Sequence, residues 1–166
     1  MNVRLFAEEL GIIAAFVPTD LSSGAITGKG VNMKHYDHLA ILVVKAAGGA
    51  AEPATLTVEQ GTDSSFTTAK ALNFTRADVK RSADITTSGT LTKVTQTAAN
   101  TLAMDGTAGN TQVLALVEFN DEDLDTENGY TWVRGKYADV GTTAQLAVMV
   151  YLMPGVRYTP PPSPLT

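Results

Sequence analysis

Two short runs of the chain hold the side chains that metal binding or catalysis would need. The only two histidines, His35 and His38, enclose Tyr36 and Asp37 in one run. Imidazole and carboxylate groups bind zinc, but a catalytic zinc site takes three protein ligands. On an extended segment His35 and Asp37 share one face while His38 points away, and no further ligand is near in the sequence. We therefore expect a polar loop that leads into the next strand.

The second run is acidic and covers residues 121–127. Calcium prefers clustered carboxylates, and the spacing of Asp121, Asp123 and Asp125 matches the start of an EF-hand loop. The match then fails, because a threonine stands where the sharp-turn glycine belongs and Trp132 stands where the closing glutamate belongs. We expect a solvated acidic turn or a negative contact patch for a basic partner.

Tyr130 and Trp132 are the aromatic residues best placed to stack on a ligand. On a strand they share one face, where two rings could bind a sugar. A single tryptophan followed by Val133 and Arg134 is more often a core or interface residue. We expect Trp132 to lie at a subunit interface.

No catalytic set emerges from the sequence. The histidines have no G-x-S-x-G elbow with them, and the glycines of residues 24–30 lack the strand-before, helix-after context of a phosphate-binding loop. A glycosidase pair of carboxylates can come from distant strands, yet nothing singles out such a pair. We expect a protein that is not an enzyme and that uses no cofactor and no metal ion.

Composition and charge limit the class of protein and its partners. The chain has 166 residues, 44% apolar and 17% charged, with no cysteine, which is enough for one domain stabilised by packing without disulfides. The net charge is −5, and the densest basic cluster, Arg76, Lys80 and Arg81, is interrupted by an acid and predicts a solvated turn. Nucleic acid and anionic membranes are therefore not expected partners.

Targeting and membrane signals are also missing from the sequence. The first ten residues carry two acids where a signal peptide needs an apolar run. The longest apolar stretches, residues 39–44 and 146–153, are too short to span a bilayer. We expect a soluble protein made in the cytoplasm.

The elements that must position these residues are strands. Alternating or apolar segments separated by turn residues recur along the chain, giving eight to ten expected strands and an all-β jelly roll or related antiparallel sandwich. Those expected are residues 12–17, 31–33, 39–44, 55–60, 69–75, 91–97, 101–104, 113–119, 131–137 and 144–152. The last three, with turn residues between them, predict an antiparallel module. Residues 39–44 are apolar at both parities, so both faces of that strand should be covered.

We divide the chain into three parts. Residues 1–30 are expected to form an N-terminal arm with turns, residues 31–153 a single β domain, and residues 154–166 an extended C-terminal arm rich in proline. Residues 76–110 fit either strands or a long loop, and a loop of that length would indicate a functional protrusion.

Several segments resemble virion proteins of tailed bacteriophages. They are residues 17–24 (VPTDLSSG), 36–48, 56–63, 70–74 and 117–158, the last with the pattern DLD, NG, V, ADVG and AQL in order. The resemblance covers most of the chain except residues 76–110. It implies a virion building block, in first place a head decoration (cement) protein, with no catalytic residues to transfer.

The resemblance also implies partners and a location. The partner would be the major capsid protein, bound on the phage head after assembly in the bacterial cytoplasm. Binding repeated sites favours a symmetric oligomer, for which we expect a trimer. Both arms would reach neighbours, through Arg4, Phe6, Arg157, Tyr158, Pro160, Pro161 and Pro162.

Two other functions remain open at this point. The first is a neck or tail protein, which predicts ring-like oligomers at low copy number. The second, from a different class, is a carbohydrate-binding module that would use Tyr130 and Trp132, with calcium at the acidic run.

Overall fold

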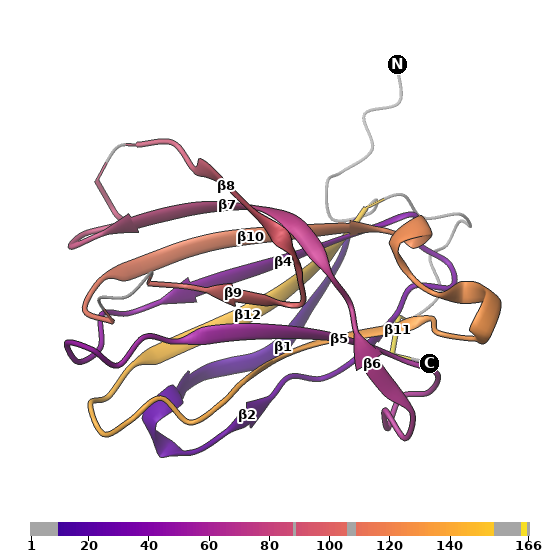
Figure 1. Cartoon of the computed structure of the whole chain (residues 1–166), viewed down its shortest axis with the longest axis horizontal. Coiled ribbons are helices and arrows are strands. Elements are labelled where there is room, and N and C mark those ends of the chain that lie inside the picture. Colours follow the sequence, from indigo (N-terminus) through magenta and orange to yellow (C-terminus); the bar gives the residue numbers. More distant parts are fainter. Residues whose placement is uncertain (1–9, 88, 106–108, 155–163, 166) are drawn as a thin grey trace.

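The computed structural model describes residues 10–87, 89–105, 109–154 and 164–165 and shows two antiparallel sheets packed as a sandwich (Figure 1). The expected all-β sandwich is therefore confirmed. Sheet A contains, in spatial order, β1 (Gly11–Asp20), β12 (Leu146–Met153), β4 (His38–Lys45), β10 (Gln112–Asn120), β7 (Phe74–Ser82) and β8 (Thr92–Ala99). Sheet B contains β2 (Ile26–Thr27), β11 (Trp132–Tyr137), β5 (Thr55–Gly61) and β6 (Ala69–Ala71), with β3 (Val31–Asn32) on β11 and β9 (Thr101–Ala103) on β5.

Strand pairing follows the order of a jelly roll. From the two ends of the fold inward, β1 pairs with β12, β2 with β11, β4 with β10 and β5 with β6, all antiparallel. A long antiparallel ribbon that is rolled up in this way places alternate pairs in opposite sheets. The strands β7, β8 and β9 are an addition between β6 and β10.

The sequence predicted that the last three strands form one antiparallel module, but in the structure they do not lie side by side. Strands β10 and β12 both pair with β4 in sheet A, whereas β11 pairs with β5 in sheet B. Each connection between them therefore crosses the sandwich. Turn residues marked where the strands end but carried no information about which sheet the chain enters next.

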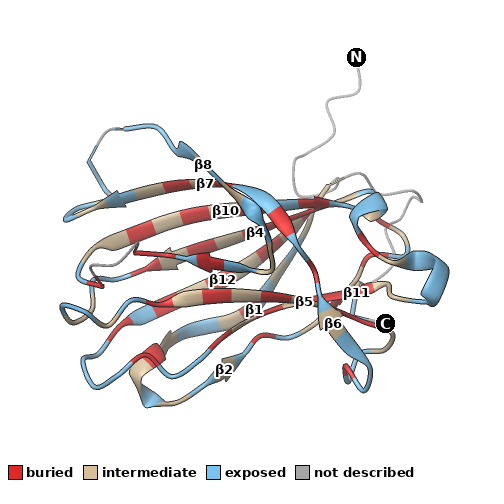
Figure 2. Ribbon diagram, in the orientation of Figure 1, coloured by how far each residue is buried: buried red, intermediate tan, exposed pale blue. Residues whose placement is uncertain are grey.

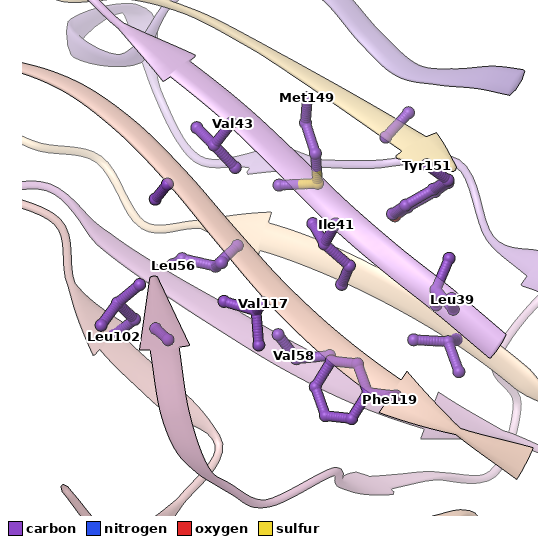
Figure 3. Packing of buried hydrophobic residues seen from close by; sticks show 14 of the residues in the cluster. Leu39, Ile41, Val43, Leu56, Val58, Leu102, Val117, Phe119, Met149 and Tyr151 are labelled. Atoms are coloured by element: carbon purple, nitrogen blue, oxygen red, sulfur yellow. The ribbon is translucent and has the colours of Figure 1, made fainter. Parts of the chain in front are cut away.

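The core lies between the sheets and follows the alternation of the strands. Odd-numbered side chains of β4, β10 and β12 point inward and meet β5 and β9 (Figure 3). The labelled members are Leu39, Ile41, Val43, Leu56, Val58, Leu102, Val117, Phe119, Met149 and Tyr151. Each is at most 2% exposed, and burying such a side chain contributes about 1.5–3 kcal/mol.

Residues 74–103 resolve the ambiguous middle of the sequence. The segment expected to be a solvated basic turn is strand β7, which extends sheet A beyond β10. Ala77 and Val79 point into the core, and the charged residues that alternate with them along the strand point out. Strand β8 then pairs with β7, and β9 crosses to β5, so the addition borders both sheets.

Residues 11–30 belong to the sandwich and not to an N-terminal arm as the sequence predicted, while residues 1–9 lie outside the described residues. Residues 11–20 form β1, which pairs along β12 at the edge of sheet A, and residues 26–32 contribute β2 and β3. At the other end of the chain, the carbonyl of Pro164 accepts a hydrogen bond from the Asn32 amide of β3 (2.7 Å).

Helix is limited, in the described ranges, to three short 3₁₀ turns. They are η1 (Leu21–Ser23), η2 (Asp121–Asp123) and η3 (Thr126–Asn128). No helix among these residues has the length and apolarity needed to cross a membrane.

Candidate functional site

Most of the contact residues expected from the sequence belong to the two arms. They lie outside the described residues: Arg4, Phe6, Arg157, Tyr158, Pro160, Pro161 and Pro162. Their contact role stays a prediction.

Trp132 begins β11 and is only 8% exposed within its own chain. Tyr130 precedes it, and the ammonium of Lys70 lies 4.4 Å from the centre of the Tyr130 ring. A sugar platform needs open ring faces, and the tryptophan offers almost none. The pair therefore does not form the stacking surface of a carbohydrate-binding module, while the interface role of Trp132 stays a prediction.

The histidine run is tied into the β4–β10 ladder. The imidazole of His38 lies 3.0 Å from the amide oxygen of Asn120 and 3.2 Å from a carboxylate oxygen of Glu118. Tyr36 is buried, at 1% exposure. No group of three or more histidine, aspartate or glutamate side chains in the described part of the chain is arranged to hold a metal ion.

Carboxylates of the acidic run, residues 121–127, accept hydrogen bonds from residues of the same connection. Asp123 accepts a hydrogen bond from the Asn120 amide (2.7 Å), and Asp125 accepts one from the Asn128 side chain (2.8 Å). Asp125 also pairs with Lys70 of β6, which lowers the pKa of that carboxyl group. These contacts give a structured acidic turn, and a role of this run as a contact patch for a basic partner stays a prediction.

A buried ion pair lies at one end of the sandwich. Lys45 at the end of β4 and Asp105 after β9 are fully buried, with the ammonium nitrogen 3.1 Å from a carboxylate oxygen. The ammonium also donates to the Ala46 carbonyl (2.8 Å), and the carboxylate accepts from the Ala54 amide (3.2 Å). Burial raises the pKa of Asp105 despite the lysine. Without solvent access, this pair is a structural link between the sheets.

The loops at the same end are closed by two further carboxylates. Glu52 accepts hydrogen bonds from the amides of Thr142 and Thr143, each 3.1 Å, and Asp20 accepts one from the Gln145 amide at 2.8 Å. These bonds lower the pKa of both carboxyl groups. The acids and the lysine at this end are thus occupied by the fold.

The feature best suited to function is the outer face of sheet A. Register aligns three rows across four strands: Ile12, Leu152 and Ala40; then Ala14, Val150, Leu42 and Leu116; then Val148, Val44 and Leu114. Val17 and Leu146 extend the surface at one end. We call these twelve residues the apolar face.

The apolar face is most exposed along β1 and at the start of β12. Ile12, Val17 and Leu146 are 55%, 67% and 54% exposed. In the middle of β4, β10 and β12, buried positions alternate with half-buried ones (Figure 2), although Ala40 is itself buried at 7% exposure. A hollow of about 360 Å³ indents one end of the face, between Pro18 of β1 and Ile85 of the β7–β8 loop. Large apolar patches on soluble proteins mark interaction sites.

The outer face of sheet B has the opposite character. Glu59 of β5 forms ion pairs with Arg134 (3.1 Å) and with Lys136, both on β11. Burial alone would raise the pKa of Glu59, but the two cations bring it below its usual range. The Arg134 guanidinium also lies 4.2 Å from the centre of the Phe66 ring. Sheet B therefore presents a polar surface of paired charges, so only sheet A shows an apolar face.

Charged residues border the apolar face on the β7 side. Arg76 and Asp78 form an ion pair (3.0 Å), and Asp78 stands opposite Lys93 of β8. Lys80 turns to the carbonyl of Ile85 (2.9 Å). Glu118 of β10, opposite Ala40 and 3.2 Å from His38, continues this border, along which acidic and basic residues alternate.

Sequence reasoning found one strand of this site and missed the surface. The double-sided apolar pattern of residues 39–44 signalled that β4 needs cover on both faces. The sequence could not predict which strands lie beside β4, because the rows of the apolar face depend on pairings between distant segments.

Comparisons with known proteins add little. No family model matches the chain, and no curated protein matches it. The crystal structure of the SPBc2 prophage-derived protein YomS is similar, with a TM-score of 0.45 and 10% identity over 92% of this chain and 99% of that one. A likeness at this level carries no argument about function.

Proposed function

We propose that this chain is a structural, non-enzymatic protein of a tailed-phage virion, and within the virion a decoration (cement) protein on the outer surface of the head. The observation that carries the proposal is the apolar face, because a wide apolar surface on a small sandwich suits a subunit of an assembly. The sequence resemblance to phage virion proteins supports the same class.

The roles of the ionisable groups are consistent with this proposal. Asp20 and Glu52 cap loops, Lys45 and Asp105 link the sheets, and Asp125 holds a turn. Each of these contacts stabilises the folded sandwich, and a subunit that binds a shell needs a stable fold. The major capsid protein is the partner that we propose, with contacts from the arms.

Binding to phage heads that lack the protein tests the proposal. Purified chain is added to such heads in increasing amounts, and the bound fraction is measured after sedimentation. We expect saturation at a fixed, high number of copies per head. Binding of a few copies at one vertex or to tails would favour the neck or tail alternative, and no binding to any virion part would contradict the proposal.

A further inference from the structure

We propose that copies of this chain associate through the apolar face, with this face of one copy against the same face of the next. The inference names the partner of the surface on which the proposed function rests. The sequence and the register first indicate that the face needs cover. Leu42 and Val44 continue the apolar run of β4 on its outer side, where Val148, Val150, Leu114 and Leu116 flank them. An antiparallel sheet open to water usually alternates apolar and polar residues, and this one does not.

The size of the face suits a contact between proteins. Strands lie about 4.8 Å apart and rise about 3.4 Å per residue, so the spans of the face on its four strands, residues 12–17, 146–152, 40–44 and 114–116, cover roughly 350 Å² before side-chain relief is counted. A standard interface takes about 800 Å² from each partner, with an apolar centre and a polar rim. The apolar face corresponds to the apolar centre of such an interface, and its charged border on β7 to part of the rim.

The exposed apolar side chains indicate which partner fits. Among the described residues, the large hydrophobic ones that are clearly exposed are Ile12, Val17, Leu91, Leu146 and Leu165. Three of these five belong to the apolar face. The apolar surface that another copy offers is therefore mainly this same face.

Charge also favours a second copy over a strongly charged partner. The chain carries a net charge of −5, which opposes association in general. The twelve residues of the apolar face are uncharged, and the acids beside them have nearby bases: Asp78 pairs with Arg76, and Glu118, opposite Ala40, lies 3.2 Å from His38. Two such faces can meet over their uncharged rows with these pairs at the rim, while a strongly charged partner would find little complementary charge.

The first test measures the mass of the purified chain by size-exclusion chromatography with light scattering. Because a contact between the same face of two copies closes as a two-fold dimer, we expect about twice 17.5 kDa for the natural sequence. In Leu42→Glu a charge enters the centre of the face, and self-association should weaken at least about tenfold because a buried unpaired charge is costly. The matched control is Thr57→Glu, which places the same charge on the outer face of sheet B and should keep the oligomer.

Val17→Glu protects the test against misfolding, because that side chain is already 67% exposed in the single chain. Cross-linking gives an independent reading, since the chain has no cysteine. Leu42→Cys should form covalent dimers with a short bismaleimide, and Thr57→Cys should not. The inference would be overturned if the natural protein were monomeric, or if its oligomer survived both Leu42→Glu and Val17→Glu. The face would then be assigned to another occupant.

The two proposals can fail separately. If the chain stays monomeric but saturates phage heads, the inference is wrong and the decoration role stands. If Leu42→Glu abolishes an oligomer that binds no virion part, the inference stands and the decoration role is wrong.

Discussion

Lys45 and Asp105 show how individual residues stabilise this fold. Their ion pair is fully buried and joins the end of β4 to the segment after β9. A buried pair contributes little over an apolar pair of the same volume, but removal of one partner leaves an isolated charge. The pair could not be predicted, because its members are far apart in the sequence and neither lies in a recognisable motif.

Replacing one member should therefore be much worse than replacing both. We expect Asp105→Ala to lower the free energy of unfolding by about 3–5 kcal/mol, and Lys45→Met with Asp105→Leu to recover most of that loss. Urea unfolding of the three proteins provides the measurement. A double variant as unstable as the single one would contradict the isolated-charge explanation.

Glu52 should make the loop end sensitive to acid. Its pKa is below the ordinary 4.5 because the folded state holds the carboxylate on the amides of Thr142 and Thr143. A carboxyl group whose pKa is lower in the folded state stabilises the fold at pH values above its pKa in the unfolded state. That stabilisation is lost as the pH falls through its pKa in the folded state.

Glu52→Gln should thus melt at a lower temperature than the natural chain at pH 7, and the difference should shrink below about pH 4.5. Glu122→Gln is the control, because it removes the same charge from an exposed position of η2. A difference that stays constant between pH 7 and pH 3 would argue against carboxylate capping.

At the scale of elements, strand β7 shows what sequence patterns can and cannot predict. Strands with long apolar alternation, such as β4, β5 and β10, were predicted within one or two residues of their bounds. Most of strand β7 was missed because, after Phe74, its inward side chains are only Ala77 and Val79, set among charged residues. Sheet membership could not be predicted at all, since long-range pairing and not local turns decides it.

Arg81 should be the residue that fastens β9 to β7. Its guanidinium donates to the carbonyls of Met104 (2.5 Å) and Ala103 (2.8 Å). We expect Arg81→Ala to lower the free energy of unfolding by about 1–2 kcal/mol and to speed amide hydrogen exchange in residues 101–105.

Arg76→Ala is the matched control, because Arg76 pairs with Asp78 on its own strand and reaches no other element through that bond. It should change stability by less than about 1 kcal/mol. Equal exchange rates in residues 101–105 for the two variants would remove this role from Arg81.

At the scale of the whole molecule, the two sheets form the folded body, and we expect residues 155–166 to make contacts with neighbours. Deletion of residues 155–166 should weaken binding to phage heads while both sheets remain, because the hydrogen bond from Asn32 to Pro164 is one bond at the short strand β3. Circular dichroism and thermal melting check the fold, and sedimentation with heads checks binding. Unchanged binding by the truncated chain would contradict a contact role for Arg157, Tyr158 and the prolines.

The most direct measurement of the central claim is the copy number of this chain in purified phage particles. Quantitative mass spectrometry gives its ratio to the major capsid protein. The account predicts a ratio comparable to one for each capsid subunit, as a shell-binding protein requires. A ratio far below that would place the chain in the neck or tail, and complete absence from the particle would contradict a virion role.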